Sequence, residues 1–203
     1  RGGAPLRRQS RRGGAADQNL ILFNDMTIYN PAHFFGFFSA FNPDVVKEIE
    51  LYKSSIPEKY GGRVASVLDV VSKNGNKKKL SGAGGIGPLT SKLTIEGPII
   101  KEKTSFIVGA RSTYSNWLMK LIPDEAYKKS TASFYDITAH INHEINTKNN
   151  LYLTAYISND QFKLNNDTLY KYGNHNINLR WKHIFNSKFN AVFSGGYDSY
   201  KYS

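Results

Sequence analysis

The residues that could do chemistry in this chain are its histidines, its serines and one glycine-rich run, and none forms a catalytic or metal-binding pattern. The chain has five histidines and no cysteine. His140 and His143 would project from opposite faces of a strand, so they cannot bind one metal ion together. No serine stands in the glycine elbow of a hydrolase, and the run 82–87 lacks the Lys-Ser or Lys-Thr pair of a phosphate-binding loop. We therefore expect no enzymatic activity, no cofactor and no metal site.

The other polar side chains depend on the strands that position them. From Leu80 onward, apolar and polar residues alternate over long runs, which is the period of strands with one apolar and one polar face. The contrast is clearest from Phe134 to Ile145. The pattern predicts seven antiparallel strands, near residues 80–87, 92–99, 104–114, 134–145, 151–158, 177–185 and 189–197.

The connections between these strands favour a transmembrane β-barrel. Short turns at 100–103, 146–149 and 186–188 alternate with longer connections at 115–131 and 165–173, as in outer-membrane barrels. Strands of roughly ten residues match a tilted membrane strand, and aromatic residues near the strand ends fit an interfacial girdle. A soluble sandwich stays open as an alternative, because it alternates too. The chain has no run of 18 consecutive apolar residues, which excludes a transmembrane helix.

If the strands form a barrel, their polar side chains face its lumen. Parity places six charged or titratable residues there: Arg111, Asp136, His140, Glu144, Arg180 and Lys182. Arg111, His140 and Arg180 are candidates for substrate contact. The alternative is that each is a solvated lumen residue that makes structural pairs.

The net charge of +11 is concentrated in two stretches. Residues 1–16 contain five arginines and no acidic residue, and four lysines follow between 73 and 79. The rest of the chain is nearly neutral, so a nucleic-acid-binding surface on the folded body is not expected. An Arg/Gly-rich RNA-binding segment at residues 1–16 is the alternative to a flexible end.

The first part of the chain reads as a small mixed unit. Residues 19–23 predict a strand, Asn24-Asp25 a turn, and 26–29 the returning strand. Asn42-Pro43-Asp44 has the composition of a helix N-terminus and predicts a short helix. A strand around 49–52, a turn at Gly61-Gly62 and a strand over 64–72 follow. The basic, turn-rich linker 73–79 predicts the domain boundary.

An aromatic cluster interrupts this unit. His33, Phe34 and Phe35 belong to a segment with four phenylalanines within residues 34–38. Such a cluster could form a ligand-facing loop, which makes these three residues further candidates for substrate contact. Packing into the core is the alternative.

Several motifs of this chain resemble the second half of the plug of TonB-dependent outer-membrane receptors. The resemblance rests on an Arg-Gly-Gly, a strand, a predicted helix and a Tyr-Gly turn that follow one another at similar spacing. In this sequence they are Arg12-Gly13-Gly14, 17–22, 42–53, and 60–69, which begins with Tyr60, Gly61, Gly62 and Arg63. Residues 82–98 resemble the first barrel hairpin after the plug. Residues 1–11 do not fit, and Asn24-Asp25 stands where an Asp-Gly turn is usual.

The resemblance implies a mainly β fold: a partial plug of mixed α/β structure followed by about seven antiparallel strands of an incomplete transmembrane β-barrel. Residues 1–11 would be a flexible Arg/Gly-rich end, 12–76 the C-terminal part of the plug, and 77–203 the N-terminal barrel strands. Such receptors close at about 22 strands, so the chain would be a piece of a receptor. The box that contacts TonB is absent from it.

The resemblance also implies a function and partners. The intact protein would actively take up a scarce nutrient, such as a siderophore, corrinoid or oligosaccharide, across the outer membrane of a Gram-negative cell. Its partners would be the TonB system, outer-membrane lipid and the small-molecule or oligosaccharide ligand, and no nucleic acid is expected. A passive porin or adhesin-type barrel is the alternative, although it gives no reason for the unit before the strands.

Overall fold

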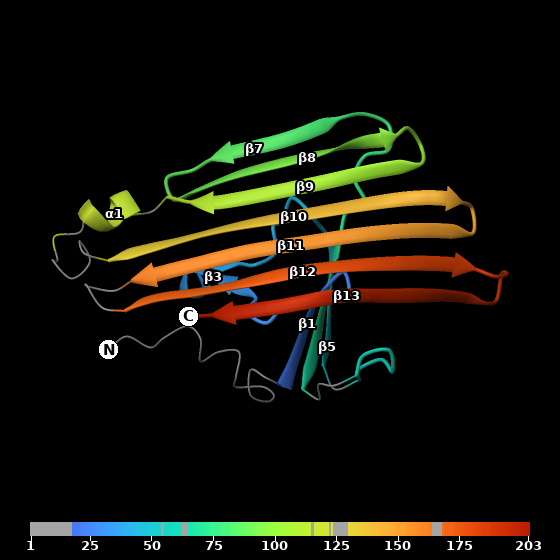
Figure 1. Cartoon of the computed structure of the whole chain (residues 1–203), viewed down its shortest axis with the longest axis horizontal. Helices are drawn as coiled ribbons and strands as arrows, with labels where there is room; N and C mark the ends of the chain where they lie inside the picture. Colours follow the sequence, from blue (N-terminus) through green and yellow to red (C-terminus); the bar gives the residue numbers. More distant parts are fainter. Residues whose placement is uncertain are drawn as a thin grey trace.

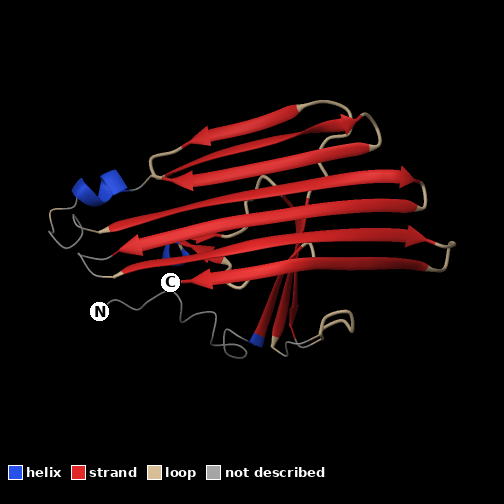
Figure 2. Ribbon diagram, in the orientation of Figure 1, coloured by secondary structure: helices blue, strands red, loops and turns tan. Residues whose placement is uncertain are grey.

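The computed structural model describes residues 18–53, 55–61, 65–114, 116–121, 123, 130–163 and 168–203. These residues form two main sheets, drawn in Figures 1 and 2. The elements before residue 80 are β1 (Asn19–Phe23), β2 (Met26–Thr27), β3 (Ala32–His33), the 3-10 turn η4 (Phe34–Gly36), β4 (Phe38–Ser39), β5 (Val46–Lys53) and β6 (Ser66–Ser72). The later elements are β7 (Ser81–Ile86), β8 (Thr90–Ile100), β9 (Thr104–Thr113), α1 (Asn116–Leu121), β10 (Thr131–Asn146), β11 (Asn149–Lys163), β12 (Leu169–Ile184) and β13 (Asn190–Tyr202).

The large sheet contains the seven strands β7 to β13 in sequence order, and each pairs antiparallel with its neighbours. The seven predicted strands are therefore confirmed. Several are longer than alternation indicated, because strand pairing continues through polar residues, as between Asp160 and Tyr172. Short turns join β8 to β9, β10 to β11 and β12 to β13 at one end of the sheet, and we call the other end, where β9 and β11 end and β10 and β12 begin, the long-connection end.

The small sheet has the order β2-β1-β6-β5, with β1 parallel to β6. The predicted hairpin is confirmed: Asn24 and Asp25 form its turn with φ angles of 47° and 68°, the positive values that a tight type I′ hairpin turn requires. In Figure 1 the strands of the small sheet run across those of the large sheet, behind it.

The predicted helix at Asn42 is wrong. Asn42 does cap the segment, since its side-chain Oδ1 accepts the Asp44 N–H at 3.1 Å, and its carbonyl accepts the N–H groups of Val45 and Val46. Only one turn forms, and strand β5 begins at Val46. The β-branched residues that follow favour extension, and pairing with β6 provides the partner. The helix α1 lies instead in the connection after β9. No helix in the described part of the chain is long and apolar enough to cross a membrane.

The two faces of the large sheet differ in polarity. On β10, even-numbered residues from Ala132 to Asn142 are buried, and most of them are polar. Their odd-numbered neighbours Tyr135, Ile137 and Ile145 are more than 40% exposed. We call the buried polar side the inner face and the exposed apolar side the outer face. The inner face packs against the residues before β7, which we call the N-terminal part.

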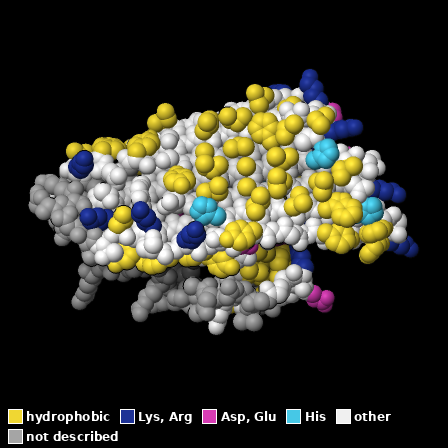
Figure 3. Space-filling view, in the orientation of Figure 1, with side chains coloured by type: hydrophobic (Ala, Val, Ile, Leu, Met, Phe, Trp, Pro, Cys, Tyr) yellow, Lys and Arg dark blue, Asp and Glu magenta, His cyan; other side chains and the backbone are white. Residues whose placement is uncertain are grey.

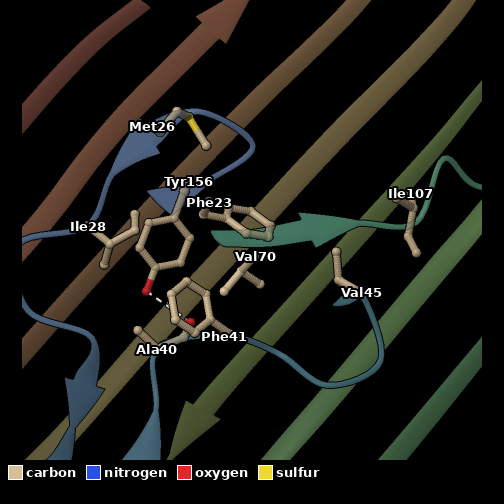
Figure 4. Packing of buried hydrophobic residues seen from close by; sticks show 9 residues of the cluster. All are labelled: Phe23, Met26, Ile28, Ala40, Phe41, Val45, Val70, Ile107 and Tyr156. Carbon is tan, nitrogen blue, oxygen red and sulfur yellow. Dashed lines mark hydrogen bonds between the residues drawn. The ribbon is translucent and has the colours of Figure 1, made fainter. Parts of the chain in front are cut away.

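An apolar cluster joins the N-terminal part to the inner face. It consists of Phe23, Met26, Ile28, Ala40, Phe41, Val45 and Val70, together with Ile107 of β9 and Tyr156 of β11 (Figure 4). Phe23 contacts Phe41 and Tyr156 with ring centroids 5.8 and 6.3 Å apart. Tyr156 also donates its hydroxyl to the Ala40 carbonyl at 3.2 Å. Only two of its nine residues belong to the large sheet, and the two parts are also joined by numerous hydrogen bonds and ion pairs.

Candidate functional site

The N-terminal part meets the inner face through a buried charged cluster around His33. His33 ends β3 and is only 1% exposed. Its Nδ1 lies 2.7 Å from Asp160 Oδ2, and its Nε2 lies 3.4 Å from Asp136 Oδ2. The ring stacks on Phe134 at a centroid distance of 4.4 Å. Two strands of the large sheet, β10 and β11, therefore hold one histidine of the N-terminal part between their carboxylates.

Arg111 completes this cluster from β9. Its guanidinium pairs with Asp136, with Nη2 to Oδ2 at 2.7 Å and Nε to Oδ2 at 2.9 Å. The same group donates to the carbonyl of Ser39 at 2.8 Å. Arg111 thus joins a carboxylate of the large sheet to the backbone of β4, and a charge-assisted fork of this kind fixes orientation as well as distance.

The two carboxylates control the charge of His33. Burial by itself lowers the pKa of His33, but hydrogen bonds and negative charges from Asp136 and Asp160 outweigh it and raise the pKa above 6.5. The protonated ring can donate from both nitrogens, which suits its position between two acceptors. The cluster therefore favours charged His33.

A second set of polar contacts is neutral and centres on Asn24. Its Nδ2 donates to Ser72 Oγ at 2.7 Å and to Thr154 Oγ1 at 3.2 Å, and its Oδ1 accepts the Ser72 N–H. Thr154 Oγ1 also lies 2.8 Å from Nδ1 of His140, which is 1% exposed. The turn of the first hairpin is thereby fixed to the middle of the large sheet.

Side chains of β12 and β13 bind the backbone of the same hairpin. Asn178 Nδ2 donates to the Asn24 carbonyl at 2.9 Å, and Asn176 Nδ2 donates to the Thr27 carbonyl at 3.0 Å. The Thr27 N–H donates to Asp198 Oδ2 at 2.8 Å. The Tyr29 N–H donates to Asn174 Oδ1 at 3.3 Å. Strand β2 is the edge of the small sheet, and these side chains satisfy backbone groups that a further strand would otherwise pair.

The long-connection end of the inner face is aromatic. Phe162, Tyr170 and Tyr202 form a row across β11, β12 and β13, with ring centroids 4.9 and 6.4 Å apart. The 3-10 turn of the N-terminal part lies close by, because Phe34 lines a small pocket with Asp160, Phe162 and Tyr172, among others. Phe37 of the same segment is 75% exposed. Among the described residues, these rings therefore gather at the long-connection end of the inner face.

The structure places the predicted substrate-facing residues at different depths. His33 and Arg111 share Asp136, whereas His140 lies in the separate cluster around Asn24. Arg180 pairs with Asp25 at 3.4 Å. Phe34 is partly buried, and the side chain of Phe35 lies outside the described part. Contact of any of these residues with a substrate stays a prediction.

Of the predicted plug motif, only Tyr60 and Gly61 fall on described residues. Tyr60 donates its hydroxyl to Asp69 Oδ2 at 2.5 Å. Burial and this bond raise the pKa of Tyr60. Arg12, Gly13, Gly14, Gly62 and Arg63 lie outside the described residues, as does the predicted flexible end 1–11.

Sequence reasoning missed several residues of the interface. Asp160 has the same parity as Thr154 and Tyr156, but the predicted strand stopped at 158, so its inward position was not inferred. The asparagines 174 and 176 lie before the predicted start of their strand. Continuing the period of two through these polar residues would have found all three. Nothing in the pattern indicates that Asn24 contacts β11.

The comparisons with known proteins bear on the fold. No protein-family model matches the chain, and no curated protein sequence matches it. Among solved structures, the chain is similar to the siderophore receptor PirA from Pseudomonas aeruginosa, with a TM-score of 0.64 and 16% sequence identity. The similarity covers 92% of this chain and 33% of that receptor, so the chain spans about a third of the receptor's length. The chain therefore has the fold of part of such a receptor, a mainly β architecture with seven antiparallel strands.

Proposed function

We propose that this chain is part of a TonB-dependent outer-membrane transporter that takes up a scarce nutrient. The observation that carries the proposal is the inverted polarity of the large sheet. Its inner face binds a separate N-terminal part mainly through polar groups, and its outer face is apolar and exposed. A lumen that holds a movable plug inside a lipid-facing wall requires this arrangement. In the proposal, residues 12–76 are the plug part and residues 77–203 the wall.

The contacts between the two parts suit a plug that moves. Water can replace each hydrogen bond between the hairpin and the asparagines of β12, because both partners can be solvated. The apolar cluster resists separation, but it includes only two residues of the large sheet. In the intact protein, TonB would supply the force that separates the parts.

The proposed ligand is a siderophore, a corrinoid or an oligosaccharide. The aromatic row and the exposed Phe37 support a ligand with flat or ring-shaped groups that stack on aromatic side chains. In the proposal, Phe34 and Phe35 contact the ligand directly. In the same proposal, His33 and Arg111 lie farther from the long-connection end, and His140 and Arg180 lie farther still along the inner face. Ligand contact would reach these deeper residues when the plug rearranges.

A reversible cross-link between the two parts tests the proposal. The chain has no cysteine, and a Cβ placed on Gly109 of β9 would lie 2.4 Å from Cγ2 of Val45. Val45→Cys removes the methyl group that would clash, and the two positions are close enough for Val45→Cys with Gly109→Cys to form a disulfide, in which the Cβ atoms lie about 3.8 Å apart. In the full-length protein, we expect the oxidised pair to bind ligand but to abolish energised uptake, and reduction to restore uptake.

The matched control is a disulfide within the large sheet. Ala139 and Ala155 are cross-strand partners on the outer face of β10 and β11, so Ala139→Cys with Ala155→Cys links two wall strands and leaves the N-terminal part free. Uptake should continue in this variant. If the protein is a passive porin, neither disulfide should change uptake, and that result would overturn the transporter proposal.

A further inference from the structure

The charged residues of the large sheet are divided between its two faces. Strand register places all five acidic residues of strands β7 to β13 on the inner face: Glu96, Asp136, Glu144, Asp160 and Asp198. The outer face of these strands therefore has no carboxylate. It does have three lysines, namely Lys163 on β11, Lys171 on β12 and Lys201 on β13.

These three lysines form one row across adjacent strands. Lys171 is paired with Gln161, two residues before Lys163, and Lys201 is paired with Gly173, two residues after Lys171. Each lysine is thus the diagonal neighbour of the next, a relation that separates Cα atoms by about 7–8 Å. Among the described residues, none of the three forms an ion pair.

The row lies at the boundary of the apolar region of the outer face. On β11 the outward residues Leu151, Leu153, Ala155 and Ile157 are apolar, and Asn159, Gln161 and Lys163 then follow toward the long-connection end. Figure 3 shows this face, with hydrophobic side chains over the middle and basic side chains gathered at both ends. The row is therefore at the level where lipid headgroups would meet the wall of a membrane barrel.

Among the described strand residues of the outer face, these three neighbouring ammonium groups have no carboxylate beside them. They repel one another, and an anion between them removes that cost. We propose that Lys163, Lys171 and Lys201 form a binding surface for the anionic phosphate groups of membrane lipids in the leaflet at the long-connection end. The inference rests on the proposed membrane location and goes beyond transport. The exposed, outward position of His175 beside the row adds a hydrogen-bonding group for the headgroup.

The test uses the full-length protein in bilayers of phosphatidylcholine that contain a minority of phosphatidylglycerol, the anionic probe. Native mass spectrometry then counts the phosphatidylglycerol that stays bound. The triple variant K163Q/K171Q/K201Q should lower this enrichment by roughly tenfold or more, because each lysine near an anionic lipid surface contributes to binding. The variant K163R/K171R/K201R should keep the enrichment.

The control variant K101Q/K148Q/K188Q removes the same charge from the short turns at the opposite end. This variant should keep most of the phosphatidylglycerol that the wild-type protein binds. An equal loss of bound phosphatidylglycerol in both glutamine variants, or no loss in K163Q/K171Q/K201Q, would overturn the lipid site. Energised uptake would stay intact in that case, so the proposed function would stand. If the wild-type protein does not enter bilayers at all, the membrane location fails, and the proposed function fails with it.

Discussion

At the scale of single residues, the most consequential group is the carboxylate of Asp136. It is fully buried and pairs with both Arg111 and His33, so one side chain of β10 contacts a cation of the large sheet and a cation of the N-terminal part. A buried charge that loses its partner keeps the cost of leaving water. Removing this carboxylate should therefore weaken the contact more than removing an exposed one on the same strand.

Asp136→Asn tests this expectation. It leaves the buried Arg111 without its carboxylate, and we expect a loss of about 3 kcal/mol of stability, seen as a lower midpoint of thermal unfolding in detergent. Glu144→Gln is the control, because Glu144 is also on the inner face of β10 but pairs with the partly exposed Lys77 at 2.7 Å. Glu144→Gln should change the midpoint of thermal unfolding only a little. Equal midpoints for the two variants would contradict the role of Asp136.

His33 gives the contact a pH dependence with a definite sign. Its pKa is raised in the folded protein, so protonated His33 holds the N-terminal part to Asp136 and Asp160 of the large sheet more firmly than neutral His33 does. Its contribution is complete below the ordinary pKa of about 6.5 and is lost as the pH rises through the higher pKa of the folded state. The thermal midpoint of the wild type should therefore fall across this interval.

His33→Gln is the reference for that titration. Glutamine keeps a hydrogen-bonding side chain but has no proton to lose, so the slope over this pH interval should become smaller in the variant. A slope that is the same in both proteins would show that another group causes it.

At the scale of elements, the packing of β13 on β12 depends on Gly196, one of two adjacent glycines. A Cβ on Gly196 would lie 2.4 Å from the carbonyl oxygen of Ile177 and 3.0 Å from Asn178 Oδ1. Gly196 therefore lets Asn178 keep the position from which it donates to Asn24. A Cβ on Gly195 would meet nothing within 4 Å.

The two alanine variants should differ clearly in their free energy of unfolding. Gly196→Ala forces β12 and β13 apart, and we expect a loss of about 1–3 kcal/mol in thermal or denaturant unfolding. Gly195→Ala should stay within about 0.5 kcal/mol of the wild type. If Gly196→Ala behaved like Gly195→Ala, close approach of the two strands would not be important for stability.

The sequence predicts elements better than it predicts their contacts. The seven strands follow from period-2 alternation, and the first hairpin follows from Asn24-Asp25, because these signals are local. The helix at Asn42 fails because capping residues describe a helix start but not the strand partner that ends it after one turn. The position of Asp160 between His33 and Tyr172 depends on strand ends and register, which alternation does not determine.

At the scale of the whole molecule, the large sheet has its polar face inward and its apolar face outward. A soluble sandwich would bury the apolar face against a second layer. Here Ile137, Leu153, Ile157 and Ile177 are each about 39–47% exposed. This polarity is the one that the proposed membrane wall requires.

Leu153→Arg tests that environment. The residue lies in the middle of the apolar region of the outer face, where a membrane barrel loses about 2–4 kcal/mol on gaining an arginine. We expect less heat-modifiable protein in the outer-membrane fraction. Ser133→Arg, outward but near the long-connection end, should be recovered normally. A protein that is folded in water would tolerate both substitutions equally, and this result would contradict the membrane location.

The bonds from β12 and β13 to the first hairpin reach its main chain, at Asn24, Thr27 and Tyr29. Main-chain groups are the same whatever amino acid occupies the position. The asparagines of β12 therefore recognise the backbone path of the hairpin and not its amino-acid sequence. Exposed hairpin positions such as Tyr29 can be exchanged at little cost in stability, whereas the asparagines cannot. A different hairpin of the same geometry that keeps the side chains of Phe23, Asn24 and Met26 could be grafted onto the inner face and still be held.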